Sequence, residues 1–112
     1  MQAYFYSTAN EDIYNIWVST LDKWAEKQAD DYILGIHNTA NLAAKKDKPW
    51  RQLPRDWSSR VTEHNLYFVV YKRHYIFFKE LGNGAGIGVI AVLYDGMNIP
   101  ARLKDRHLKG SI

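Results

Sequence analysis

The feature that most constrains the fold is a change in the spacing of apolar residues near the middle of the chain. Between residues 13 and 43, apolar side chains recur at three- and four-residue steps, which is the spacing of one helical face. Between residues 66 and 93, aromatic and β-branched residues gather in short runs, which is the composition of strands. A chain of 112 residues with 46% hydrophobic content has the size of one compact domain. The sequence therefore predicts a single α+β domain over residues 1–112.

The first part of the chain predicts a strand followed by two helices. Residues 2–6 are short, aromatic and apolar, and residues 7–11 have the S/T-x-x-E spacing of a capping box, so we expect a helix to begin there. The first apolar stripe consists of Ile13, Ile16, Trp17, Leu21 and Trp24, and the second of Ala29, Tyr32, Ile33, Ile36, Ala40 and Ala43. Both stripes are expected to face the core. We expect a hairpin of two helices between residues 9 and 44, because one rod of that length would be long for this domain.

The second part predicts three strands. Residues 45–59 contain two prolines and no periodic pattern, so we expect a structured loop there. Residues 66–71, 74–78 and 87–93 are the expected strands, with Lys72-Arg73 as the first hairpin tip. Strands joined this closely should pair as an antiparallel meander that completes one sheet with the N-terminal strand. The glycine-rich residues 82–86 lie between two strands, which favours a hairpin loop over a phosphate-binding loop before a helix.

Composition excludes several classes of protein. Cysteine is absent, so disulfides and thiolate metal sites are excluded. The histidines at positions 37, 64, 74 and 107 lack metal-ligand spacing, and we expect neither a metal nor a cofactor. The N-terminus has no signal-peptide pattern and no apolar run is long enough for a bilayer, so we expect a soluble, cytoplasmic protein without a membrane partner.

Charge is distributed unevenly along the chain. Before Lys45 there are two lysines against six carboxylates, a net charge of −4. From Lys45 onward there are thirteen cations against six carboxylates, a net charge of +7. This asymmetry favours one face that suits a polyanion or an acidic peptide, although ordinary solvation of surface lysine and arginine produces the same pattern.

Four segments of the chain, taken in order, carry a family resemblance. Residues 10–13 and 24–33 precede the run from His74 to Phe78, which is followed by a glycine-rich turn and by the segment from Ile87 to Leu103. Together they resemble toxins of the RelE/ParE superfamily from type II toxin-antitoxin systems, and among these the ParE-like branch. The resemblance implies a first strand, a helical hairpin and an antiparallel sheet around one core. It also implies a cognate antitoxin that docks as a helix or a strand and silences the toxin.

For the ParE-like branch, the resemblance implies inhibition of DNA gyrase by binding. Two departures from the family pattern favour this over catalysis. Tyr67 stands where many members have an arginine, and Tyr94 stands where many have a histidine. A binding inhibitor needs a shaped surface rather than an acid-base pair. Candidate contacts with DNA or gyrase are the C-terminal cations Arg102, Lys104, Arg106 and Lys109, which are also typical of a solvated, flexible basic tail over residues 104–112.

Two alternatives remain open. A RelE-like, ribosome-dependent mRNA interferase would use Tyr94 together with Arg73, His74 or Arg60 for proton transfer and phosphate binding. A nucleic-acid-binding module without toxicity would use aromatic side chains beside cations as stacking platforms.

Two tryptophans are candidate anchors for the antitoxin. Trp50 and Trp57 lie in the expected loop, each shortly after a proline, where an exposed indole would suit a docking partner. Both are equally expected to roof the core.

Overall fold

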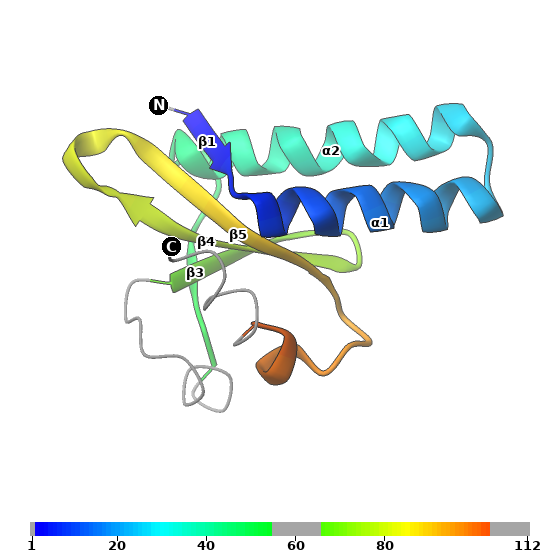
Figure 1. Cartoon of the computed structure of the whole chain (residues 1–112). Coiled ribbons are helices and arrows are strands. Elements are labelled where there is room, and N and C mark those ends of the chain that lie inside the picture. Colours follow the sequence, from blue (N-terminus) through cyan, green and yellow to red (C-terminus); the bar gives the residue numbers. More distant parts are fainter. Residues whose placement is uncertain (1, 55–65, 104–112) are drawn as a thin grey trace.

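The computed structural model describes residues 2–54 and 66–103. In chain order its elements are β1 (Gln2–Phe5), α1 (Ser7–Lys23), α2 (Glu26–Ala44), β2 (Arg51–Gln52), β3 (Leu66–Tyr71), β4 (His74–Leu81), the 3-10 turn η1 (Gly82–Gly84) and β5 (Gly86–Tyr94) (Figure 1). Residues 99–103 are helical. The chain is therefore an α+β protein, as the sequence predicts.

The strands form one five-stranded sheet in the order β1-β5-β4-β3-β2. The pairs β3–β4 and β4–β5 are antiparallel, which confirms the expected meander. β1 lies parallel to β5, so the sheet is mixed and the expectation of an antiparallel sheet is wrong at this edge. The helical hairpin between β1 and the meander allows the parallel pairing, because a parallel neighbour requires a long crossover.

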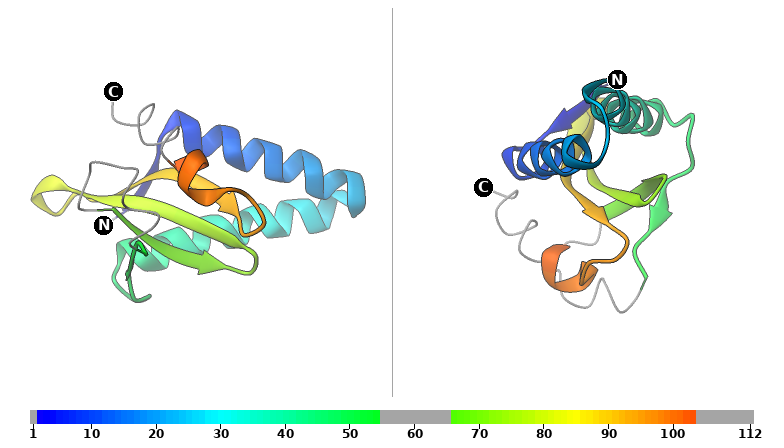
Figure 2. Two further views of the ribbon diagram at one scale, coloured as in Figure 1. Left: turned by 90° about the horizontal axis from the view of Figure 1, so that it is seen from below. Right: turned by 90° about the vertical axis from the view of Figure 1, so that its right-hand side faces the viewer.

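The sheet packs on both faces. α1 and α2 run antiparallel along one face, and the helical residues 99–103 lie on the opposite face (Figures 1 and 2). On the helix face, Ile36 and Ala40 of α2 pack with Ile76 and Phe78 of β4. On the other face, Phe77 packs with residues that include Ile99 and Leu103. Alternating side chains of β4 thus serve two apolar clusters, as the two-residue period of a strand requires.

Two expectations about the helices need correction. The break at Trp24 and Ala25 confirms two helices, but Trp24 is 60% exposed instead of buried in the core. The capping box is not formed, because α1 already begins at Ser7 and no side chain caps it. The Thr8 hydroxyl instead donates to the Ile90 carbonyl 2.8 Å away in β5. Thr8, which has the spacing of a capping residue, therefore makes a tertiary contact with β5 instead of capping α1.

The expected loop over residues 45–59 contains a short strand. β2 pairs Arg51 and Gln52 with Phe68 and Tyr67 of β3, and two residues give too little pattern to be read from sequence. Residues 55–59 lie outside the described part of the chain. The tip at Lys72-Arg73 is confirmed, with Lys72 adopting a left-handed φ of 52° where tight turns usually have glycine or asparagine.

The outer edge of β5 is covered in two different ways. β1 pairs with β5 only from Gly86 to Val89 and ends at Phe5. Beyond that point α1 crosses the edge, where Thr8 binds the Ile90 carbonyl and the Asp12 carboxylate accepts the Val92 N–H at 3.0 Å. Because backbone groups at a buried edge need partners, these two side chains replace the missing strand. They also place α1 beside the end of β5, where a groove opens.

Neither helix of the described chain combines the length and the apolar character needed to cross a bilayer.

Candidate functional site

A groove of about 730 Å³ lies between α1 and the tip of the β3–β4 hairpin. We call it the hairpin groove. Its lining residues are Asp12, Asn15, Ile16, Ser19, Thr20, Lys23, Trp24, Tyr32, Lys72, Arg73, His74, Val92, Tyr94, Met97 and Arg102. The volume is within the range of small-molecule sites, and the groove is open along one side. It therefore suits part of a larger partner as well as a small ligand.

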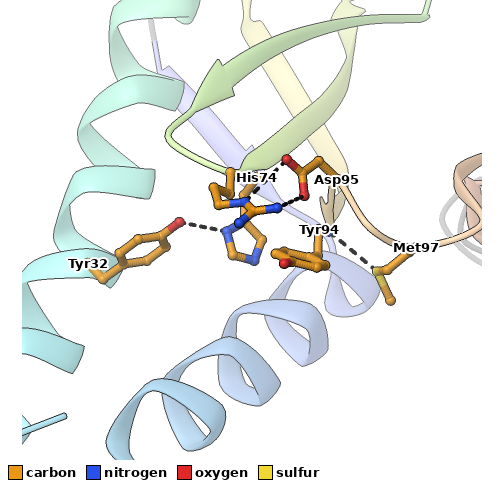
Figure 3. Close-up of polar contacts among 6 residues, drawn as sticks. Tyr32, His74, Tyr94, Asp95 and Met97 are labelled. Atoms are coloured by element: carbon orange, nitrogen blue, oxygen red, sulfur yellow. Dashed lines mark hydrogen bonds and ion pairs between the residues drawn. The ribbon is translucent and has the colours of Figure 1, made fainter. Parts of the chain in front are cut away.

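The strand register brings the polar centre of the groove together. His74 begins β4 and pairs directly with Tyr94 at the end of β5. Their rings lie 5.7 Å apart. Tyr32 reaches this pair from α2, so that the His74 ring lies between the two tyrosines (Figure 3). Three elements that are distant in sequence thus meet at one point.

His74 and Tyr32 are joined by a short hydrogen bond. The Tyr32 hydroxyl oxygen lies 2.7 Å from His74 Nδ1. Burial lowers the pKa of His74; the nearby Asp95 raises it, and Arg73 lowers it further. Burial raises the pKa of Tyr32, against a lowering by the hydrogen bond from the Arg73 backbone. Both groups are therefore held in their neutral forms at neutral pH.

Arg73 is held from two sides. Its Nε and Nη2 lie 3.4 and 3.2 Å from the two carboxylate oxygens of Asp95, and its guanidinium lies 5.2 Å from the centre of the Tyr94 ring (Figure 3). The hydrogen bond to Asp95 raises the pKa of Arg73, which stays charged. The planar fork of arginine is suited to this two-point contact. The pair neutralises much of the charge at the centre of the groove.

The remaining cations lie around this centre. Lys23 comes from the end of α1, Lys72 from the hairpin tip and Arg102 from the helical segment on the other face. Lys72 Nζ lies 5.6 Å from the centre of the Tyr32 ring. Among the described residues of the lining, the only carboxylate is that of Asp12, which is buried and bonded to the Val92 N–H. The groove can therefore bind anionic groups, with exposed Trp24 as an apolar surface at one end.

Several residues predicted from sequence meet in this groove. Tyr94, Arg73 and His74, the candidate nuclease residues, converge at its centre, and Arg102 lies on its rim. Trp50 lies elsewhere, where its indole N–H donates to the Ala43 carbonyl at 2.7 Å and its ring packs on the core, as the roofing interpretation expects. Outside the described residues lie Arg60, Trp57, Lys104, Arg106 and Lys109.

Sequence reasoning missed Tyr32, Lys23 and Lys72. The apolar stripe of its helix predicts Tyr32 in the core; Tyr32 does pack against the core cluster, but it is only half-buried and also lines the groove. The polar end of a tyrosine on such a stripe was a usable signal, because a buried phenol usually finds a hydrogen-bond partner. The two lysines gave no signal beyond charge. Within the described ranges, no group of three or more histidine and acidic residues is placed to hold a metal ion.

No protein-family model matches this chain, and no curated protein matches it significantly.

Proposed function

We propose that this protein is a ParE-like toxin of a type II toxin-antitoxin system, which inhibits DNA gyrase by binding and is neutralised by a cognate antitoxin. The proposal rests on the ordered resemblance of its segments to that family. It is supported by the α+β fold with a helical hairpin between the first strand and the meander. It is also supported by the hairpin groove, which has the charge expected of a surface that meets a DNA-bound enzyme.

One observation favours binding over bond-making. Asp95 holds the guanidinium of Arg73, the cation closest along the chain to His74, through both carboxylate oxygens. A nuclease needs an uncompensated cation where negative charge develops on the phosphate. A carboxylate at that place would repel the phosphate. A binding inhibitor has no such requirement, because it needs only to favour one conformation of its target.

The test is a supercoiling assay with purified gyrase, relaxed plasmid and the full chain at micromolar concentration. We expect supercoiling to be lost and cleaved plasmid to accumulate. Lys72→Glu reverses a charge in the groove and should weaken inhibition on the order of tenfold. Lys45→Glu is the matched control. It makes the same charge reversal just after the end of α2, about 20 Å along the helix axis from Tyr32. Full supercoiling at micromolar wild-type chain would contradict the proposal.

A RelE-like mRNA interferase is the second candidate, and one specific observation favours it. Three of its four candidate residues, Arg73, His74 and Tyr94, line one groove although nothing in the sequence required it. His74 as a neutral imidazole and Tyr94 as a phenol are groups that transfer protons. The test is primer extension on a message under translation. Cleavage that is lost in Tyr94→Phe supports this candidate, and an uncleaved message with wild-type chain removes it.

A further inference from the structure

We propose that Tyr32 is a positioning residue that holds His74 as the tautomer with its proton on Nε2. The hairpin groove then contains an uncharged N–H donor among its cations. The use of this donor in target binding rests on the proposed function, but the tautomer itself does not.

The direction of the hydrogen bond between Tyr32 and His74 follows from the chemistry of the two groups. The Tyr32 oxygen already accepts a hydrogen bond from the Arg73 backbone, which lowers the tyrosine pKa against the larger effect of burial. Its own proton remains available for His74 Nδ1, 2.7 Å away. A phenol is a stronger proton donor than a neutral imidazole N–H, and the imidazole nitrogen is the stronger base. The O–H therefore donates to Nδ1, and a neutral ring must then carry its proton on Nε2.

The surroundings of His74 favour the neutral ring. The titratable groups around His74 are Tyr32 from α2, Tyr94 from β5, Asp95 beyond β5 and Arg73 beside it on the hairpin. Burial and Arg73 lower the pKa of His74, and only Asp95 raises it. Asp95 is itself engaged by Arg73. A protonated ring would also lose its bond from the Tyr32 hydroxyl, because Nδ1 would then be a donor.

Tyr32 is held in place by its neighbours. Its ring packs edge-on against Tyr71 at 5.1 Å, and Lys72 lies over it. Tyr71 in turn occupies the space above Gly35, where any Cβ would overlap the Tyr71 ring. The glycine that interrupts the apolar pattern of α2 thus allows β3 to approach the helix. Because its neighbours fix the Tyr32 ring, the hydroxyl has little freedom to leave Nδ1.

The position of His74 Nε2 determines what the ring can bind. His74 lines the hairpin groove, and the nitrogen that does not face Tyr32 points away from α2 (Figure 3). Within the described residues Nε2 has no hydrogen-bond partner, and no buried side-chain nitrogen or oxygen lacks one. Nε2 is therefore open to the groove. It can donate to an anionic or carbonyl oxygen of a partner without adding a charge.

The direct test is nitrogen-15 NMR of the histidine rings in the full chain at pH 7.5. We expect His74 Nδ1 to have the shift of an unprotonated nitrogen and Nε2 that of a protonated one. His74→Gln identifies the signals among the four histidines. In Tyr32→Phe we expect mixed tautomers and a His74 pKa closer to its ordinary value. A protonated Nδ1 in the wild type, or an unchanged spectrum in Tyr32→Phe, would overturn the assignment.

A functional test compares two isosteres at position 74. His74→Gln places an amide N–H near the Nε2 position, whereas His74→Asn places it near Nδ1. If the Nε2 donor binds the target, gyrase inhibition by the asparagine variant falls about tenfold, the loss of one hydrogen bond, and inhibition by the glutamine variant falls clearly less. Equal losses in both variants would overturn the role of the donor. Absence of inhibition by the wild type would instead count against the proposed function, and the NMR result would still decide the tautomer.

Discussion

The two halves of β5 differ in what covers their outer edge. From Gly86 to Val89 the strand has backbone neighbours on both sides, β1 and β4. From Ile90 onward β1 is absent, and side chains of α1 take its place. The first half is buried throughout, whereas the second ends in exposed Tyr94 and a groove.

This difference shows where a small sheet can form a site. In the first half, backbone pairing with β1 and β4 covers both edges of the strand, as buried backbone groups require. A helix crossing the edge satisfies the same groups through Thr8 and Asp12, but its round surface does not follow the strand to its end. The space left between the helix and the end of β5 is the hairpin groove, and its lining includes His74 and Tyr94. The candidate site is thus a consequence of a first strand that is only four residues long.

The largest effect is expected in the half paired with β1. Gly86 has a φ of 112°, and a Cβ there would overlap the Gln2 carbonyl oxygen. Gly86→Ala should therefore lower the free energy of unfolding by about 3 kcal/mol or more, measured by chemical denaturation. Gly82→Ala is the matched control, because nothing lies within 4 Å of its Cβ position, and it should change stability by less than about 0.5 kcal/mol. Equal stability of the two variants would show that β1 does not seal this edge.

An intermediate effect is expected where α1 replaces the strand. Asp12 is buried, and Asp12→Ala would leave the Val92 N–H without its acceptor, at a cost of roughly 2 kcal/mol. Asp12→Asn should recover part of this loss, because its amide oxygen can still accept the bond. Hydrogen exchange of the Val92 amide should follow the same order. Rapid exchange in the asparagine variant alone would contradict this explanation.

The smallest effect concerns the pH dependence of stability. Burial lowers the pKa of His74 in the groove and of His37, which packs against Phe5 of β1. A histidine with a lowered folded pKa binds protons more readily when unfolded. The contribution of such a histidine to stability is therefore fully present above the unfolded pKa of about 6.5. As the pH is lowered below that value, the contribution decreases until the pH reaches the folded pKa. Because both rings are only partly buried and solvent screens them, each should contribute less than about 1 kcal/mol.

Single variants separate the two histidines. Denaturation between pH 5 and pH 8 should show a shallower loss of stability in both His74→Gln and His37→Gln than in the wild type. Added salt should alter the His74 contribution more, because Asp95 and Arg73 also act on it, whereas His37 responds to burial alone. Stability that rises as the pH falls would reverse the sign and contradict both assignments.

The sequence predicted the type and order of most elements. β3 was predicted with its observed bounds, Leu66–Tyr71, and the turn at Lys72-Arg73 was placed correctly because hairpins depend on neighbouring residues. Prediction failed where one residue pattern was compatible with two different structural roles. Thr8 has the spacing of a capping residue but binds β5, and Trp24 continues an apolar stripe but lies beyond the end of α1. The two-residue strand β2 is too short to have a period.

Local pattern alone therefore determined that this chain forms a helical hairpin and a meander, because the spacing of apolar residues is fixed by the geometry of each element. Only the tertiary structure decided that β1 lies parallel to β5 and stops early, and that Tyr32 meets His74 across 42 positions of the chain. Such contacts depend on how the finished elements pack against one another. No short stretch of sequence contains that information.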